Sequence, residues 1–393
     1  MARDAGAAKE GGGTLCNSSD QLLRNVCALF EILARRRDRR LTRADGHVSR
    51  LDSMLARSKP ALIEGNCRNW DTLAAYREEA GQSRKQLSLV QQSGKAGGIQ
   101  LFCVMRNEHD LLPRFLDHYR HLGVGRFVIV DNDSSDGSPA LLRAQRDVDL
   151  YHTRDSYAAA NGGTLWLDAL MREKARGEWV LRVDADELLV YDQCEKYPLG
   201  SLINHLRGIG ETRLLAPMVD LYPHPGRVGE LFFDATPEQR RRGARGLHIE
   251  GGPRHRMARS HGIDASPCLT KYPFARYGAR SAFANTHFPY PTAANGDRIL
   301  GRLLHLKLTG DFKSKVERAL RENQHWNEAV EYRGYARWLG AGEGAGLMFE
   351  QSTRYTGPGD LIAAALLEPI EWGRRRRLSR MAQTLRRVLV PRA

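Results

Sequence analysis

Two aspartates, Asp184 and Asp186, end a short apolar run that begins at Trp179. The run predicts a buried strand, and its C-terminal end is where open α/β sheets commonly bind ligands. Carboxylates buried there need a cation or strong hydrogen-bond donors, because burying a bare charge is costly. Their hard oxygen atoms favour Mn²⁺ or Mg²⁺, shared with a phosphorylated substrate. An Asp-x-Asp pair alone is more often a solvated turn or a helix cap than a metal site, so the preceding sequence decides its meaning.

Upstream of this pair, predicted strands alternate with predicted helices, which indicates a parallel sheet and an α/β architecture. The first strand starts at Ile99 and breaks into Arg106-Asn107-Glu108, and the second ends at Asp131. The elements expected after the first strand are a helix ending at Gly123, a strand over 126–130, a helix over 139–146, a strand over 148–152 and a helix over 165–176.

Three motifs in this order resemble the bacterial family-2-type glycosyltransferases, which have the GT-A fold. They are the segments 104–108 (VMRNE), 128–138 (VIVDNDSSDGS) and 183–187 (VDADE), and the resemblance extends over about 99–339. It implies a GT-A-like, Rossmann-like α/β fold with a mostly parallel sheet flanked by helices. It also implies transfer of a hexosyl or related group from a nucleotide-diphosphate sugar to a glycan or glycolipid acceptor, with inversion.

The same resemblance implies roles for single residues. Asp186 would ligate Mn²⁺ or Mg²⁺, while Asp184 would contact the metal, its water shell or the donor ribose. The turns after the first two strands would hold the nucleotide. Arg106, Asn107 and Glu108 would lie near the base and ribose, and Asp131 or Asn132 would contact the base edge. For the polar run 131–138, an alternative is that its side chains cap the following helix.

The catalytic base is less visible in the sequence. An inverting transferase needs a group beside the acceptor hydroxyl that takes its proton. Asp220 ends the next apolar run, at a position that faces the same sheet edge, and is our candidate. Glu230, Glu250 and Asp264 lie in polar segments beyond it and remain alternatives.

A basic, Gly- and Pro-rich segment spans 240–277 and includes Lys271. Its cations could neutralise a diphosphate, so we place Lys271 among the donor-binding residues; a solvated basic loop is the alternative. His287 and His305 are each candidates for a third metal ligand. His305 is preferred because it lies between leucines just before Lys307.

Two other functions compete with this hypothesis. A strand that ends in Asp-x-Asp is also typical of haloacid-dehalogenase-like phosphatases, in which one aspartate attacks phosphate. The following Glu187-Leu188 departs from that family's usual Thr or Val then Leu. A noncatalytic basic adaptor with the same fold is the second alternative. A calcium loop over 132–143 is excluded, because Arg143 stands where a bidentate Glu is required.

The chain has 393 residues and a formal net charge of +14. We expect a helical N-terminal extension and linker over 1–98, the transferase domain over 99–310, and C-terminal helices with a basic amphipathic tail over 311–393. The tail suits an anionic membrane surface, whereas no motif indicates specific nucleic-acid binding. Six scattered cysteines and the lack of an apolar leader predict a cytoplasmic protein. The basic tail would attach it to the inner face of the membrane, and a solvated basic tail is the alternative.

Overall fold

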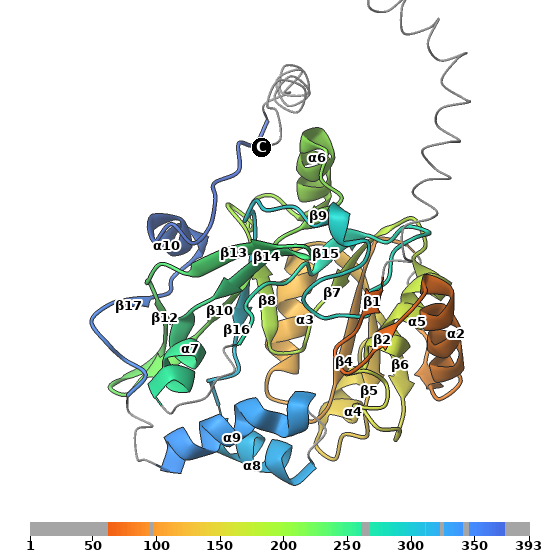
Figure 1. Cartoon of the computed structure of the whole chain (residues 1–393), viewed down its shortest axis with the longest axis horizontal. Helices are drawn as coiled ribbons and strands as arrows, with labels where there is room; N and C mark the ends of the chain where they lie inside the picture. Colours follow the sequence, from red (N-terminus) through yellow and green to blue (C-terminus); the bar gives the residue numbers. More distant parts are fainter. Residues whose placement is uncertain are drawn as a thin grey trace, which may run out of the picture. The chain divides into compact units, whose positions relative to one another are not determined.

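A seven-stranded sheet forms the centre of the fold, and its strands follow the order β3-β6-β5-β4-β7-β15-β9. The computed structural model describes residues 62–94, 97–260, 267–310, 312–322, 326–340 and 346–373. Residues 62–393 make one unit by themselves (Figure 1). The expected helices within 1–61 and the basic tail over 374–393 lie outside the described residues.

The elements of the first half are β1 (Ile63–Glu64), β2 (Asn69–Trp70), α2 (Leu73–Arg84), β3 (Ser88–Gln91), β4 (Ile99–Met105), α3 (Leu112–His121), β5 (Val124–Asp131), α4 (Ser138–Arg143), β6 (Val148–His152), α5 (Thr164–Lys174), β7 (Trp179–Arg182), β8 (Glu187–Val190) and α6 (Leu199–Ile209). Those of the second half are β9 (Arg213–Leu214), β10 (Met218–Asp220), β11 (Tyr222–His224), β12 (Arg227–Asp234), β13 (Gln239–Gly243), β14 (Gly246–Glu250), α7 (Gly252–Ser260), β15 (Phe274–Arg276), the 3₁₀ turn η1 (Thr292–Ala294), β16 (Arg302–His305), α8 (Phe312–Glu322), α9 (Trp326–Gly340), β17 (Ser352–Arg354) and α10 (Pro358–Ala363).

The four central strands, β6, β5, β4 and β7, are parallel, and their order along the chain is third, second, first, fourth. This is a Rossmann-like order, and it confirms the expected mixed α/β fold with a mostly parallel central sheet. The connection reverses direction between β4 and β7, and ligands bind at such a reversal in open α/β sheets. Arg106 follows β4 and Asp184 follows β7, so both lie at this point.

Side chains alternate between the two faces of each central strand, and both faces are buried. In β4, Leu101 and Cys103 pack in the cluster that contains Phe115 of α3. Phe102 packs in a second cluster with Trp166 of α5. Helices α3 and α5 therefore cover opposite faces of the sheet and fix the direction in which β4 and β7 end.

A three-stranded sheet, β10-β16-β8, lies next to the main sheet and sets the register of the polar residues. Asp220 in β10 stands opposite His305 in β16, which in turn stands opposite Glu187 in β8. The apolar run 214–220, which ends at Asp220, is divided between β9 and β10 in different sheets. The interruption lies around Pro217, which cannot donate a ladder hydrogen bond.

The fold unit extends beyond the expected range of 99–310. Strand β3 pairs with β6 at the edge of the main sheet, so part of the segment assigned to an N-terminal extension completes that sheet. At the other end, β17 pairs with β12, and α8 and α9 lie side by side (Figure 1). None of the helices in the described ranges is both long and apolar enough to cross a membrane.

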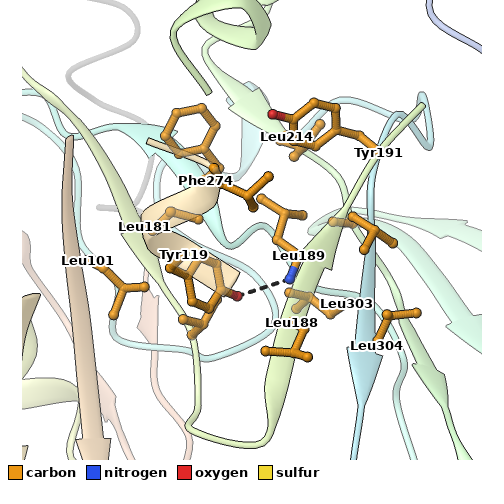
Figure 2. Packing of buried hydrophobic residues seen from close by; sticks show 14 of the residues in the cluster. Leu101, Tyr119, Leu181, Leu188, Leu189, Tyr191, Leu214, Phe274, Leu303 and Leu304 are labelled. Carbon is orange, nitrogen blue, oxygen red and sulfur yellow. Dashed lines mark hydrogen bonds between the residues drawn. The ribbon is translucent and has the colours of Figure 1, made fainter. Parts of the chain in front are cut away.

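Tyr119 of α3 joins the helix to β8 through two hydrogen bonds made by one buried hydroxyl, and Figure 2 shows the one to Leu189. The hydroxyl donates to the carbonyl of Glu187 at 2.9 Å and accepts the backbone N–H of Leu189 at 3.0 Å. Both backbone groups would otherwise be unpaired inside a core of leucines, where an unmet polar group is costly. Tyr119 therefore fixes the strand that follows the two aspartates.

We predict that Tyr119→Phe lowers the free energy of unfolding by about 1–3 kcal/mol, because it leaves a buried N–H and C=O without their partner. Urea denaturation measures the change. Tyr355→Phe is the matched control, since the Tyr355 ring packs edge-on against Phe233 and we expect little loss there. Equal stability of wild type and Tyr119→Phe would show that the hydroxyl bridge contributes nothing.

Candidate active site

The turn between β7 and β8 presents Asp184 and Asp186 at the end of the central sheet. The turn is closed by two hydrogen bonds: the N–H of Asp184 donates to the Glu187 carboxylate at 3.0 Å, and the N–H of Glu187 donates to the Asp184 carbonyl at 3.1 Å. Glu187 is buried, and its carboxylate contacts the turn from the interior of the protein. The spacing i and i+2 places the other two carboxylates at the sheet edge.

Lys271 neutralises two of these acids. Its Nζ lies 2.8 Å from Asp184 and 2.5 Å from Glu187. Burial alone would disfavour the ionised Asp184, but the ammonium of Lys271 outweighs it and lowers the pKa of the Asp184 carboxyl. The sequence predicted that Lys271 would bind the donor diphosphate. In the structure its ammonium contacts the carboxylates of Asp184 and Glu187 and so helps to hold the turn, and its part in donor binding stays a prediction.

His305 connects Asp186 to Asp220. Its Nε2 lies 3.5 Å from the Asp186 carboxylate, and its Nδ1 lies 2.6 Å from Asp220. Burial favours the neutral imidazole, yet Asp186 and Asp220 together raise the pKa of His305. Burial likewise opposes ionisation of Asp186, but the nearby His305 lowers the pKa of that carboxyl well below its usual range.

Asp220 is held from behind by Arg254. The Arg254 Nε lies 2.8 Å from each oxygen of Asp220, and both side chains are almost completely buried. Arg254 also contacts Glu331 at 3.0 Å, and Glu331 lies 3.8 Å from Lys307. A continuous series of alternating charges therefore extends from Asp186 to Lys307. Burial would raise the pKa of Asp220, but Arg254 and His305 lower it, so Asp220 is a weak base.

A cavity of about 280 Å³ opens at this end of the sheet. Its lining combines acids with cations from separate parts of the chain. Glu108 contacts Lys315 at 2.9 Å, and burial together with the proximity of Asp186 raises the pKa of Glu108 to about 7. The charged and imidazole side chains around the cavity are Arg106, Glu108, Asp184, Asp186, His305, Lys307, Lys315 and Arg318.

Two turns after β4 and β5 brace each other through their polar side chains. The backbone N–H groups of residues 107, 108 and 109 donate to Ser134, Ser138 and Asp136. Asn107 has a positive φ of 56° and accepts the N–H of Ser135 at 2.7 Å. The motif 131–138 therefore holds the Arg106–Glu108 turn in place. The alternative, that its side chains cap the following helix, does not describe α4, whose N-cap is Gly137 and makes no side-chain cap hydrogen bond.

The sequence-predicted residues separate into three groups. Those that line the 280 Å³ cavity are Arg106, Glu108, Asn132, Asp184, Asp186 and His305. Asn107, Asp131 and Asp220 are not among its described lining residues; Asn107 braces the turn, and Asp131 accepts the N–H of Ser134 at 3.3 Å. Lys271 lines a second cavity.

The alternative bases lie elsewhere. Glu230 pairs with Arg354 at 3.3 Å, Glu250 contacts His248 at 2.8 Å, and Asp264 lies outside the described residues.

Asp186 and His305 are the side chains best placed to bind a divalent cation. Their oxygen and nitrogen atoms suit Mn²⁺, and the Asp220–His305 contact is the carboxylate–histidine arrangement that orients metal-binding imidazoles. Within the ranges that the structure describes, no three His, Cys, Asp or Glu side chains converge as a ready metal site.

Helix α8 contributes cavity residues that the sequence motifs did not indicate. Lys315 and Arg318 stand three residues apart, a spacing that brings both to one helical face. A second missed feature is Asn161-Gly162-Gly163, where three successive residues have positive φ between 56° and 71°. A Cβ on Gly163 would lie 2.9 Å from Val104, so only glycine fits beside β4. The Asn-Gly-Gly triplet was the signal that could have revealed this turn.

Comparisons with known proteins give only weak similarities. No family model matches the chain, and no curated protein matches it. Among solved structures, the chain is weakly similar to the mannosyltransferase PcManGT from Pyrobaculum calidifontis, solved with GDP-Man and Mn²⁺. The match has 14% identity and a TM-score of 0.27, over 81% of this chain and 88% of that one. It is also similar to a mycobacterial protein, with 19% identity and a TM-score of 0.20, over 44% of this chain and 54% of the other.

We predict that Arg254→Met lowers the free energy of unfolding by about 3–5 kcal/mol, because it leaves the buried Asp220 carboxylate without its guanidinium partner and with only His305 beside it. The double variant Asp220→Asn with Arg254→Met should lose less than the sum of the two single losses. Denaturant unfolding of all four proteins measures the coupling. Additive losses would contradict a direct ionic contact between the two side chains.

Proposed function

We propose that this protein is a glycosyltransferase that uses a nucleotide-diphosphate sugar together with Mn²⁺ or Mg²⁺. The observation that carries the proposal is the composition of the 280 Å³ cavity, where the strand-end aspartates face basic side chains of Arg106, Lys307, Lys315 and Arg318. Acids suit a divalent cation, and the surrounding cations suit a diphosphate. The motif order in the sequence supports the same activity, and the acceptor is a glycan or glycolipid hydroxyl.

Each group has a role that follows from its position. Asp186 and His305 hold the cation, and Asp220 with Arg254 orients His305. Asp220 is thus a positioning residue in this proposal, because its carboxylate is already bound to a guanidinium and an imidazole. Lys315 and Arg318 bind the diphosphate from the α8 side, while Asn132 and Arg106 contact the nucleoside. When bound, the cation stabilises the negative charge that develops on the leaving diphosphate.

A thermal-shift screen tests the proposal directly. UDP, GDP, CDP and dTDP are each added to the full chain with and without Mn²⁺. We expect one nucleotide at a hundredfold excess over its Kd to stabilise the wild type by about 2.7 kcal/mol, and only when metal is present. Asp186→Asn should abolish this stabilisation, because it removes a charged ligand of the cation.

Asp117→Asn is the matched control for that screen, since Asp117 lies exposed on α3. It should respond to nucleotide as the wild type does. Stabilisation that persists in Asp186→Asn would refute the assigned metal ligand. The absence of a shift with every nucleotide would refute the proposed donor and favour the phosphatase or the adaptor.

A separate prediction concerns α8. Arg318→Glu should raise the Kd of the bound nucleoside diphosphate by about 10–100-fold, because it replaces a cation beside the phosphates with an anion. Isothermal titration calorimetry measures this Kd. Lys313→Glu is the control on the same helix, since Lys313 is exposed and does not line the described cavity. Equal losses in both variants would indicate a general effect of charge instead of a phosphate contact.

A further inference from the structure

A second and larger cavity, of about 580 Å³, adjoins the first. The two share four lining residues, Tyr157, Asp184, His305 and Lys307. A sugar attached to a diphosphate in the first cavity would therefore have its reacting carbon beside the second. The volume falls within the range of about 300–1,000 Å³ that is usual for ligand sites.

The carboxylates of this larger cavity are already paired with cations. Asp184 and Glu187 contact Lys271 at 2.8 and 2.5 Å, and Glu331 contacts Arg254 at 3.0 Å. An ion pair with a buried cation stabilises the charged carboxylate and so weakens it as a proton acceptor. Against the effect of burial, Lys271 lowers the pKa of Asp184, and Lys307 with Arg254 lowers that of Glu331, so both acids are weak proton acceptors. Burial raises the pKa of Glu187, but its carboxylate is taken up by Lys271 and by the N–H of Asp184 within the turn.

The three imidazoles of the larger cavity differ in whether a carboxylate contacts them. His305 lies between two carboxylates, and His248 contacts Glu250 at 2.8 Å. His287 instead has its Nδ1 2.8 Å from the carbonyl oxygen of Thr270. A carbonyl oxygen only accepts, so Nδ1 carries the hydrogen and the Nε2 lone pair remains to accept a proton.

Burial and a neighbouring cation favour the neutral imidazole of His287. Burial, followed by the nearby ammonium of Lys271, lowers the pKa of His287 to about 4. Its basicity is then close to that of an ordinary carboxylate, whose reference pKa is about 4. An imidazole of this kind accepts a proton as readily as an unpaired Asp or Glu. Because the unprotonated ring is uncharged, its burial requires no counter-ion.

The loop that carries His287 is held by the side-chain amides of two asparagines, one within the loop and one from a distant part of the chain. Asn285 accepts the N–H of His287 at 2.8 Å. Asn66, from the turn after β1, accepts the N–H of Thr286 at 3.0 Å and donates to the Asn161 carbonyl at 3.2 Å. The segment before β4 thus positions His287, which is the kind of support a catalytic group requires.

We propose that the 580 Å³ cavity binds the acceptor and that His287 is the catalytic base for its hydroxyl. This inference rests on the proposed transferase function. The acceptor O–H proton moves to Nε2 of His287 while the acceptor oxygen bonds to the anomeric carbon. The bond from that carbon to the phosphate oxygen breaks, and its electron pair leaves with the nucleoside diphosphate. The proton on Nε2 then passes to solvent.

His287→Asn tests the base without removing the loop contact, because the Asn amide can still donate to Thr270. The full chain with Mn²⁺ is given UDP-glucose, GDP-mannose, CDP-glucose and dTDP-glucose, with water as the acceptor, and nucleotide release is measured. A parallel set contains azide, an anion that attacks without losing a proton. We expect His287→Asn to slow hydrolysis by about 10²–10⁴-fold while azide transfer stays within about threefold of wild type.

His121→Asn is the matched control, since His121 is an exposed histidine of α3, and both of its rates should equal those of wild type. Unchanged hydrolysis in His287→Asn, or equal losses with water and azide, would overturn the inference and leave the donor site intact. A wild type that binds nucleotide but hydrolyses none of the donors would also overturn it, because an available base would activate water. Failure of the proposed function is distinct, since the wild type would then bind no nucleotide.

Discussion

Charge compensation among buried side chains is the constraint on which the rest of this site depends. Asp186, His305 and Asp220 lie in contact, and Arg254 and Glu331 continue the series. Each carboxylate is removed from water at a considerable cost, and a neighbouring cation offsets that cost only when the geometry is good. The three-stranded sheet supplies the geometry, because its register sets Asp220 and His305 directly opposite each other.

The partner of each charged side chain also indicates whether that side chain holds the site together or is available to a ligand. A carboxylate already bound to a guanidinium, such as Asp220, is a poor proton acceptor and a good anchor. Asp186 differs because its counter-charge is the imidazole of His305, whose Nε2 lies 3.5 Å away, and not a guanidinium. Pairing therefore distinguishes chemically similar acids that the sequence alone leaves equivalent.

Much of the central sheet could be predicted from local sequence. The strands β4, β5, β6 and β7 and the helices between them carry strong apolar periodicity, and each was expected close to its observed range. The aspartate turn was visible for the same reason, since a buried strand that ends in two acids is a local pattern. Its place at the reversal between β4 and β7 depends on the strand order, which the local sequence did not predict.

Other features depend on contacts between distant segments, which a local pattern does not encode. Lys271 could be recognised as a cation near the site, but its contacts with Asp184 and Glu187 depend on how the chain passes beside β7. The cations of α8 resemble any solvated helical face until the fold places that helix over the cavity. The run 131–138 was ambiguous because its side chains satisfy the backbone of a turn nearly thirty residues earlier.

The amide frame around His287 makes the same point about the N-terminal part of the fold. Asn66 belongs to a turn that by sequence looks like a linker, yet its side chain joins the 285–288 loop to Asn161. Gly65 contributes as well, since its carbonyl accepts from Asn285 at 3.2 Å and a Cβ there would lie 2.3 Å from the Arg68 carbonyl. These contacts explain why the fold unit begins before β4: the wall of the larger cavity is completed by residues that precede the central sheet.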